Sequence, residues 1–109
     1  MHARMLLIKA KPGQVKELAK ALTDRALPIL RQQPGFIEAL ALSAESEADE
    51  FVGISIWKTK EAADNYVNGP GRPLLQSFSS YFAQPPDFRM FNVEGSTIQS
   101  IAAARAATQ

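Results

Sequence analysis

The chain has 109 residues, of which 46% are hydrophobic and 21% are charged, and its formal net charge at pH 7 is +1. These values are typical of one soluble globular domain, and the small charge favours neither nucleic acid nor an anionic membrane as a partner. Because the chain has no cysteine, disulfides, thiolate metal sites and cysteine nucleophiles are excluded. The single histidine, His2, excludes a multi-histidine metal site and a Ser-His-Asp triad set in the core.

No apolar run approaches the ~20 residues that span a bilayer. The apolar stretch at residues 5–8 is too short for a signal peptide, and no small-residue cleavage site follows it. We therefore expect a cytoplasmic protein that has no membrane partner.

Residues 4–10 contain a continuous apolar run, which is typical of a strand. After Pro12-Gly13 the apolar residues recur at spacings of three and four, which predicts an amphipathic helix. Its apolar face consists of Val15, Leu18, Ala19, Leu22, Ala26, Ile29 and Leu30. Pro28 lies inside this helix and should kink it or split off its last turn, and Pro34-Gly35 should end it.

Two more strands are predicted at residues 36–43 and 50–57, joined by an acidic connection of hairpin length. The connection, residues 44–49, lacks the regularly spaced oxygen ligands and the glycine of a calcium loop. We interpret it as a solvated turn.

A second helix is predicted at residues 59–67, with Thr59 as its N-cap. The Asn68-Gly69-Pro70-Gly71 sequence should break it, and Pro73 is suited to the first position of a second piece. That piece has an apolar stripe made of Leu74, Leu75, Phe78 and Phe82.

The chain ends with a predicted fourth strand at residues 87–94 and a tail rich in alanine. We place the domain at residues 1–95 and the tail at residues 96–109. The tail has few large apolar groups, so it is expected either to fray or to pack on a neighbouring subunit. It could form a helix that begins at Ile98.

The order β-α-β-β-α-β predicts an α+β, ferredoxin-like fold, with a four-stranded antiparallel sheet and both helices on one face. A sheet with one wet face should alternate apolar and polar residues. The strand at residues 50–57 does not, because Phe51 and Trp57 point one way while Val52, Ile54 and Ile56 point the other. We therefore expect a homodimer formed through the open sheet face.

Three segments resemble the antibiotic biosynthesis monooxygenase family: Pro12-Gly13, Pro34-Gly35-Phe36 and the stretch at residues 56–63, Ile-Trp-Lys-Thr-Lys-Glu-Ala-Ala. The resemblance covers residues 4–94 and implies a dimeric α/β barrel. Branches of this family include quinol monooxygenases, cofactor-free oxygenases of polyketide tailoring and haem-degrading proteins.

The haem-degrading branch uses an asparagine on the first strand, a tryptophan on the second helix and a histidine as iron ligand. The matching positions of this chain hold Leu6, Tyr66 and a residue at or near Gln76. No histidine occurs in that helix, so the resemblance does not extend to haem degradation.

What the resemblance implies is a cofactor-independent monooxygenase that acts with dioxygen on a small aromatic, quinol or polyketide-type substrate. We expect no metal and no organic cofactor. Such chemistry needs an apolar pocket that excludes water, with a few groups that stabilise the substrate anion. The candidate catalytic residues are Tyr66 and Trp57, and the candidate substrate-binding residues are Arg72, Gln76, Tyr81, Leu6 and Phe78.

Each polar or aromatic candidate also has a structural interpretation. Trp57 is suited to anchoring the core, and the hydroxyl of Tyr66 could simply reach solvent. Arg72 and Gln76 are suited to the surface, and Tyr81 to packing beside Phe82. His2 is interpreted as a disordered terminal residue, which would act as a base only if the N-terminus folded over a pocket.

An alternative function is a non-catalytic dimeric module that binds a small apolar ligand or stabilises an assembly. A closed cavity of roughly 300 Å³ or more beside Tyr66 and Gln76 would favour the enzyme. If Leu6, Trp57 and Phe78 filled that space, the alternative would be favoured.

Overall fold

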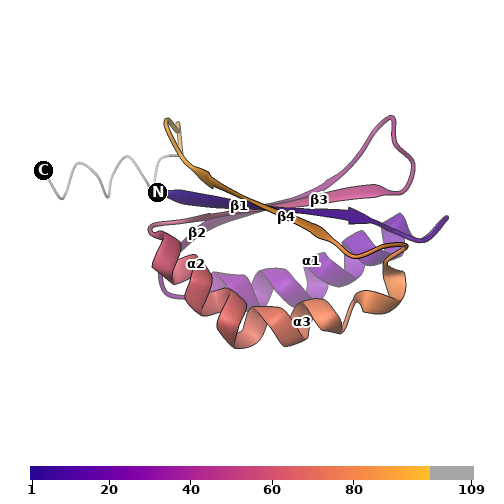
Figure 1. Cartoon of the computed structure of the whole chain (residues 1–109), viewed down its shortest axis with the longest axis horizontal. Helices are drawn as coiled ribbons and strands as arrows, with labels where there is room; N and C mark the ends of the chain where they lie inside the picture. Colours follow the sequence, from indigo (N-terminus) through magenta and orange to yellow (C-terminus); the bar gives the residue numbers. More distant parts are fainter. Residues whose placement is uncertain (99–109) are drawn as a thin grey trace, which may run out of the picture.

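The computed structural model describes residues 1–98, which form one antiparallel sheet covered on one face by helices (Figure 1). The strands lie in the order β2-β3-β1-β4. Their bounds are β1 (His2–Lys9), β2 (Phe36–Ser43), β3 (Glu50–Trp57) and β4 (Asp87–Asn92). The predicted order of elements and the ferredoxin-like α+β fold are confirmed. The sheet is open, and its closure into a dimeric barrel stays a prediction.

Helix α1 (Val15–Arg31) follows the predicted period and buries Leu18, Leu22, Ala26 and Leu30. It runs through Pro28 without interruption, so its last turn is not split off. Leu30, which is 9% exposed, holds that turn in the core by clustering with the buried Trp57 and Ala63. The following turn depends on Gly35, which has a φ of +80° and would place a Cβ 2.6 Å from that of Ala62.

The second helical segment differs from the prediction because it bends rather than stops. Helix α2 (Lys60–Tyr66) begins at Thr59, whose side chain accepts a hydrogen bond from the amide of Ala62 and confirms the N-cap. The chain continues through η1 (Val67–Gly71), a π-helical turn, into α3 (Arg72–Gln76). Gly69, with φ −99° and ψ −114°, makes the kink. A short turn of 3₁₀ helix, η2 (Ser79–Tyr81), leads towards β4.

Strand β1 begins earlier than the apolar run indicated. His2 pairs with Trp57 of β3 and with Asn92 of β4, and it is 5% exposed. The interpretation of His2 as a disordered terminal residue is therefore wrong. Strand pairing on both sides orders it, which a reading of the local sequence does not reveal. Strand β4 ends two residues before the predicted end, at Asn92.

Two clusters of buried side chains form the core between the helices and the sheet. The first core cluster contains Ile8, Ala10, Leu18, Leu22, Ala26, Phe51 and Phe78. The second core cluster contains Leu30, Trp57 and Ala63. Because Ile8 pairs with Phe51 and His2 pairs with Trp57, the two clusters lie at opposite ends of the central strands.

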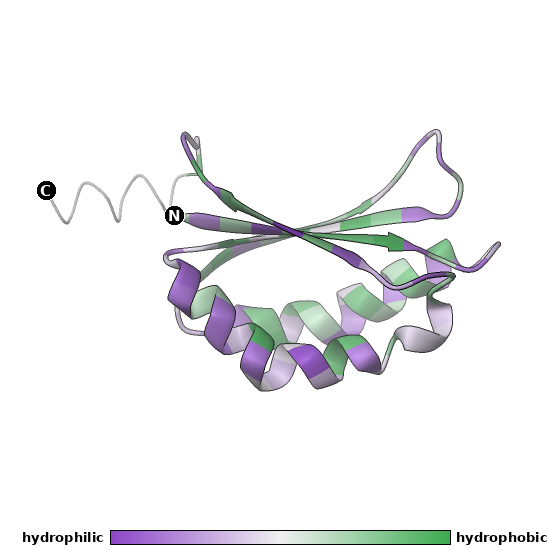
Figure 2. Ribbon diagram, viewed as in Figure 1, coloured by the Kyte–Doolittle hydropathy of each residue, from purple (hydrophilic) through white to green (hydrophobic). Residues whose placement is uncertain are grey.

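The helices lie on one face of the sheet, and no element of residues 1–98 lies over its outer face (Figure 1), where the ribbon includes hydrophobic residues (Figure 2). Leu40, Leu42 and Phe91 are 49%, 43% and 45% exposed, and their registers place them on this face with Ile54 and Val52. Apart from Ile98, the expected helix in the tail lies beyond the described residues. Among those residues, no helix has the length and hydropathy needed to cross a bilayer.

Candidate functional site

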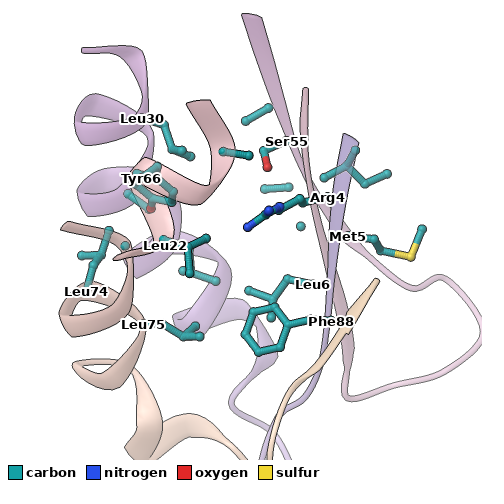
Figure 3. Close-up of a pocket in the computed structure, with 18 of the residues that line it drawn as sticks. Arg4, Met5, Leu6, Leu22, Leu30, Ser55, Tyr66, Leu74, Leu75 and Phe88 are labelled. Carbon is teal, nitrogen blue, oxygen red and sulfur yellow. The ribbon is translucent and has the colours of Figure 1, made fainter. Parts of the chain in front are cut away.

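A cavity of about 630 Å³ separates the helices from the sheet (Figure 3). Its volume is within the range of ligand sites, roughly 300–1,000 Å³. Alternation along the strands directs every second side chain into this space. Arg4 and Leu6 of β1 point towards the helices, for example, while Met5 points away (Figure 3).

One end of the cavity, which we call the polar end, lies beside the second core cluster. Its functional groups come from β1, β3 and α2 and belong to Arg4, Ser55, Trp57 and Tyr66. Trp57 is fully buried, and its indole N–H donates a hydrogen bond of 2.9 Å to the hydroxyl of Ser55. This bond satisfies the only polar atom of the indole, so Trp57 can serve as a rigid wall.

Two aromatic contacts fix the ring of Tyr66 and the wall behind it. The rings of Trp57 and Tyr66 have centroids 5.4 Å apart at an angle of 32°, and Phe36 meets Trp57 edge-on at 5.5 Å. Burial raises the pKa of the Tyr66 phenol above its usual value. The hydroxyl is therefore neutral at physiological pH and available as a hydrogen-bond donor, which would make it a poor base.

Gly71 explains how Tyr66 reaches this position. A Cβ at Gly71 would lie 2.8 Å from the Tyr66 ring and 2.9 Å from the Tyr66 carbonyl oxygen. The π-helical turn η1 therefore closes tightly on Tyr66, and only glycine leaves room for the ring.

Arg4 supplies the positive charge of the polar end. Its side chain is 16% exposed and forms an ion pair with Asp64 of α2. Its Nε–H donates a hydrogen bond of 3.1 Å to Nε2 of His2. Desolvation, followed by the nearby Arg4 charge, lowers the pKa of His2, so the imidazole is neutral near pH 7 and accepts this bond. The Arg4 hydrogen bond holds the pKa of Asp64 below its usual value.

The other end, which we call the apolar end, lies beside the first core cluster. It is lined by Leu6, Leu22, Leu75, Phe78 and Phe88. Phe78 is fully buried, whereas Phe88 is 57% exposed on the edge strand β4. Phe88 therefore lies at the hydrophobic rim of this end, and Phe78 forms part of its inner wall.

The structure places six of the seven predicted site residues around the cavity: Tyr66, Trp57, Arg72, Gln76, Leu6 and Phe78. Arg72 and Gln76 are exposed, which places them at its rim. Tyr81 does not line the cavity and packs against the first core cluster. The catalytic and binding roles of these residues stay predictions.

Sequence reasoning missed Arg4 and Ser55 as cavity residues and did not connect His2 with them. One signal was present, because Arg4 shares the helix-facing side of β1 with Leu6 and Ile8. An arginine at such a position needs a partner or a ligand. The structure also has no group of three or more His, Asp or Glu side chains arranged to hold a metal ion within residues 1–98.

Comparison with known proteins identifies the family. A model of the antibiotic biosynthesis monooxygenase family matches residues 1–72. The chain belongs to this family. No curated protein sequence matches the chain.

Solved structures of low sequence identity share the fold of this family member. A Streptomyces coelicolor monooxygenase, from the gene ActVA-Orf6 and in complex with nanaomycin D, is 20% identical with a TM-score of 0.75, covering 87% of this chain and 88% of its own. The N63A mutant of SnoaB, a cofactor-independent oxygenase from Streptomyces nogalater, is 16% identical with a TM-score of 0.74, covering 88% and 95%. NE2512 from Nitrosomonas europaea, a protein of unknown function, is 22% identical with a TM-score of 0.75, covering 88% and 91%.

Proposed function

We propose that this protein is a cofactor-independent monooxygenase of the cytoplasm that uses dioxygen to oxidise a small aromatic, quinol or polyketide-type substrate. The observation that carries the proposal is the cavity of about 630 Å³, whose walls are mostly apolar and whose polar end has one cation and one phenol. The apolar walls suit fused aromatic rings and exclude water. Arg4 and Tyr66 suit the stabilisation of an anionic oxygen.

For an anthrone, the reaction that this site would support needs no reagent besides dioxygen. Loss of one proton to solvent gives a delocalised anion, which transfers one electron to dioxygen. The carbon radical and superoxide combine to form a C–O bond, and protonation gives a hydroperoxide. Cleavage of its O–O bond, with loss of the remaining C–H proton, releases water and leaves a ketone. One oxygen atom ends in the ketone and the other in water, so the oxidation balances.

Two of the relatives support this choice of chemistry. SnoaB is described as a cofactor-independent oxygenase, and the Streptomyces coelicolor monooxygenase has been solved with the ligand nanaomycin D. Their identity to this chain is too low to transfer a substrate, so the cavity and its polar groups carry the proposal.

The test is oxygen consumption by the purified protein against a panel of hydroquinones and anthrones. We expect uptake above the uncatalysed rate with at least one anthrone. The Tyr66→Phe variant should lower kcat by roughly 10- to 1,000-fold if the phenol stabilises the developing oxyanion. Tight binding without any oxygen uptake would contradict the enzyme and support the alternative, a non-catalytic module that binds a small apolar ligand.

We further propose that a second copy of the chain covers the outer face of the sheet. The exposed Leu40, Leu42 and Phe91 belong to one apolar surface with Val52 and Ile54. A surface of this kind marks an interaction site when it is contiguous. Light scattering after size-exclusion chromatography should give the mass of a dimer at micromolar concentration. A monomer at that concentration would contradict the proposal.

A further inference from the structure

Arg4 occupies an unusual position for a surface charge. It lies in the central strand β1, on the helix-facing side, and its guanidinium extends into the cavity between Leu6, Ser55 and Tyr66 (Figure 3). Only 16% of its side chain is exposed. Burying a cation among apolar walls costs free energy unless partners compensate it.

The partners of Arg4 compensate it incompletely. Two of its five N–H donors are engaged, by Nε2 of His2 and by the carboxylate of Asp64. The other three meet no acceptor in the part of the chain that the structure describes, and since no buried side-chain nitrogen there lacks a partner, they are open to solvent in the cavity. The Asp64 side chain is 44% exposed, so water screens its charge more than that of Arg4.

His2 holds the guanidinium without neutralising it. As a neutral imidazole it accepts the Nε–H bond and contributes no negative charge. The histidine is itself 5% exposed and fixed between β3 and β4, so it is a rigid support. Arg4 is therefore oriented, partly unpaired and directed at the cavity, which is the arrangement expected of an anion-binding group.

We propose that Arg4 binds the ionised oxygen of the substrate, a phenolate or an aryl enolate, and thereby favours its anionic form in the cavity. This inference rests on the proposed function and narrows its substrate class to aromatic molecules with an acidic hydroxyl or an enolisable ring ketone. The anion of an anthrone is such an enolate, with its charge on the ring oxygen. A neutral substrate loses one proton to solvent when it binds in this form. Its ionised oxygen then competes with the carboxylate of Asp64 for Arg4.

The test uses 2-hydroxyanthraquinone, a phenol that is already oxidised at its central ring and absorbs at longer wavelength when ionised. Its absorbance is titrated with pH in the presence of the full-length protein. An opposite charge at close range lowers the pKa of an acid by about 1–3 units. We expect the bound probe to ionise at least about 1 unit lower in wild type than in Arg4→Met. Arg4→Lys should retain part of this shift because it keeps the charge but loses the planar fork.

Arg31→Met is the matched control. Arg31 is exposed at the end of α1, so this substitution removes the same charge outside the cavity. It should leave the bound pKa at its wild-type value. Equal bound pKa values in wild type and Arg4→Met would overturn the inference, and so would an equal loss of the shift in Arg4→Met and Arg31→Met.

Asp64→Asn provides a second variant that leaves Arg4 in place, in case Arg4→Met does not fold. It removes the competing carboxylate, so the bound probe should ionise at a still lower pH and its phenolate should bind several-fold more tightly. An unchanged affinity would overturn the inference. If wild type consumes oxygen with an anthrone but Arg4→Met leaves both the rate and the bound pKa unchanged, this inference fails alone. If wild type neither binds the probe nor oxidises any anthrone, the proposed function fails with it.

Discussion

The two ends of the cavity are built differently, although the same strands and helices form both. At the apolar end the walls are hydrocarbon. Phe78 and Phe88 provide apolar contact area there but no hydrogen-bonding group that would orient a ligand. At the polar end each group is held by another: Trp57 by Ser55, Tyr66 by Trp57 and Gly71, and Arg4 by His2 and Asp64. A ligand would gain affinity from the first end and orientation from the second. This division is common in small-molecule sites, which combine apolar walls with a few placed polar groups.

The largest effect should come from removing the inner wall of the apolar end. Phe78 is fully buried in the first core cluster, so Phe78→Ala should lower the free energy of unfolding by about 3–5 kcal/mol. Urea titration followed by circular dichroism measures it. Phe88→Ala, on the exposed rim, should change the free energy of unfolding by less than about 1 kcal/mol while weakening the binding of the anthraquinone probe. Equal destabilisation by both variants would contradict the distinction between rim and core.

A smaller effect is expected at the turn behind the polar end. Gly35→Ala forces a positive φ on alanine and brings its Cβ onto that of Ala62, so it should cost roughly 2–4 kcal/mol of unfolding free energy. Gly13 is the matched control, because its φ is +77° but no atom beyond its two neighbours in the chain lies within 4 Å of its Cβ position. Gly13→Ala should cost only about 1–2 kcal/mol. If both variants lost the same free energy of unfolding, the close approach of Gly35 to Ala62 of α2 would contribute nothing to the cost.

The next test displaces Tyr66 by crowding its ring and its carbonyl oxygen. Gly71→Ala should push the Tyr66 ring away from Trp57 and cost about 1–3 kcal/mol of unfolding free energy. Trp57 is the only tryptophan, so its fluorescence reports directly on the loss of the ring contact. Asn68→Ala, at an exposed position of η1, should leave both the emission and the stability within about 0.5 kcal/mol of wild type. An unshifted spectrum in Gly71→Ala would contradict the role assigned to Gly71.

The two ends also differ in how much of each the sequence could predict. The apolar end follows from local periodicity, because Leu22, Leu75 and Phe78 lie on helical stripes that are visible in the chain. Trp57 and Tyr66 were found because the period changes beside them and because the family resemblance aligned them. The polar end as a whole depends on contacts between distant residues. Asp64 and Arg4 are 60 positions apart, and only the packing of α2 against β1 brings them together.

His2 shows the same limit most clearly. Its neighbours in the chain gave no reason to expect order, since the apolar run begins only at Met5. The pairing of β1 with both β3 and β4 buries it, and that register is set by the whole sheet. A single histidine therefore seemed uninformative in the sequence, yet in the structure it supports the cation of the site.

The smallest effect tests this support through pH. Burial and Arg4 lower the pKa of His2 in the folded protein, with Lys60 and the N-terminus acting in the same direction and Asp64 opposing them. The unfolded chain therefore takes up the His2 proton first as the pH falls below about 6.5, and the free energy of unfolding should decrease from there down to the folded-state pKa. Urea midpoints between pH 7.5 and 5.0 measure this slope above the range in which Asp64 titrates. His2→Gln keeps an acceptor for Arg4 but has no titrating group at this position. Its unfolding free energy should therefore change less with pH than that of wild type. A wild-type slope no steeper than that of His2→Gln would show that His2 is as easily protonated in the folded protein as in the unfolded chain, and below a pH of about 6.5 Arg4 would then face a second cation rather than a neutral support.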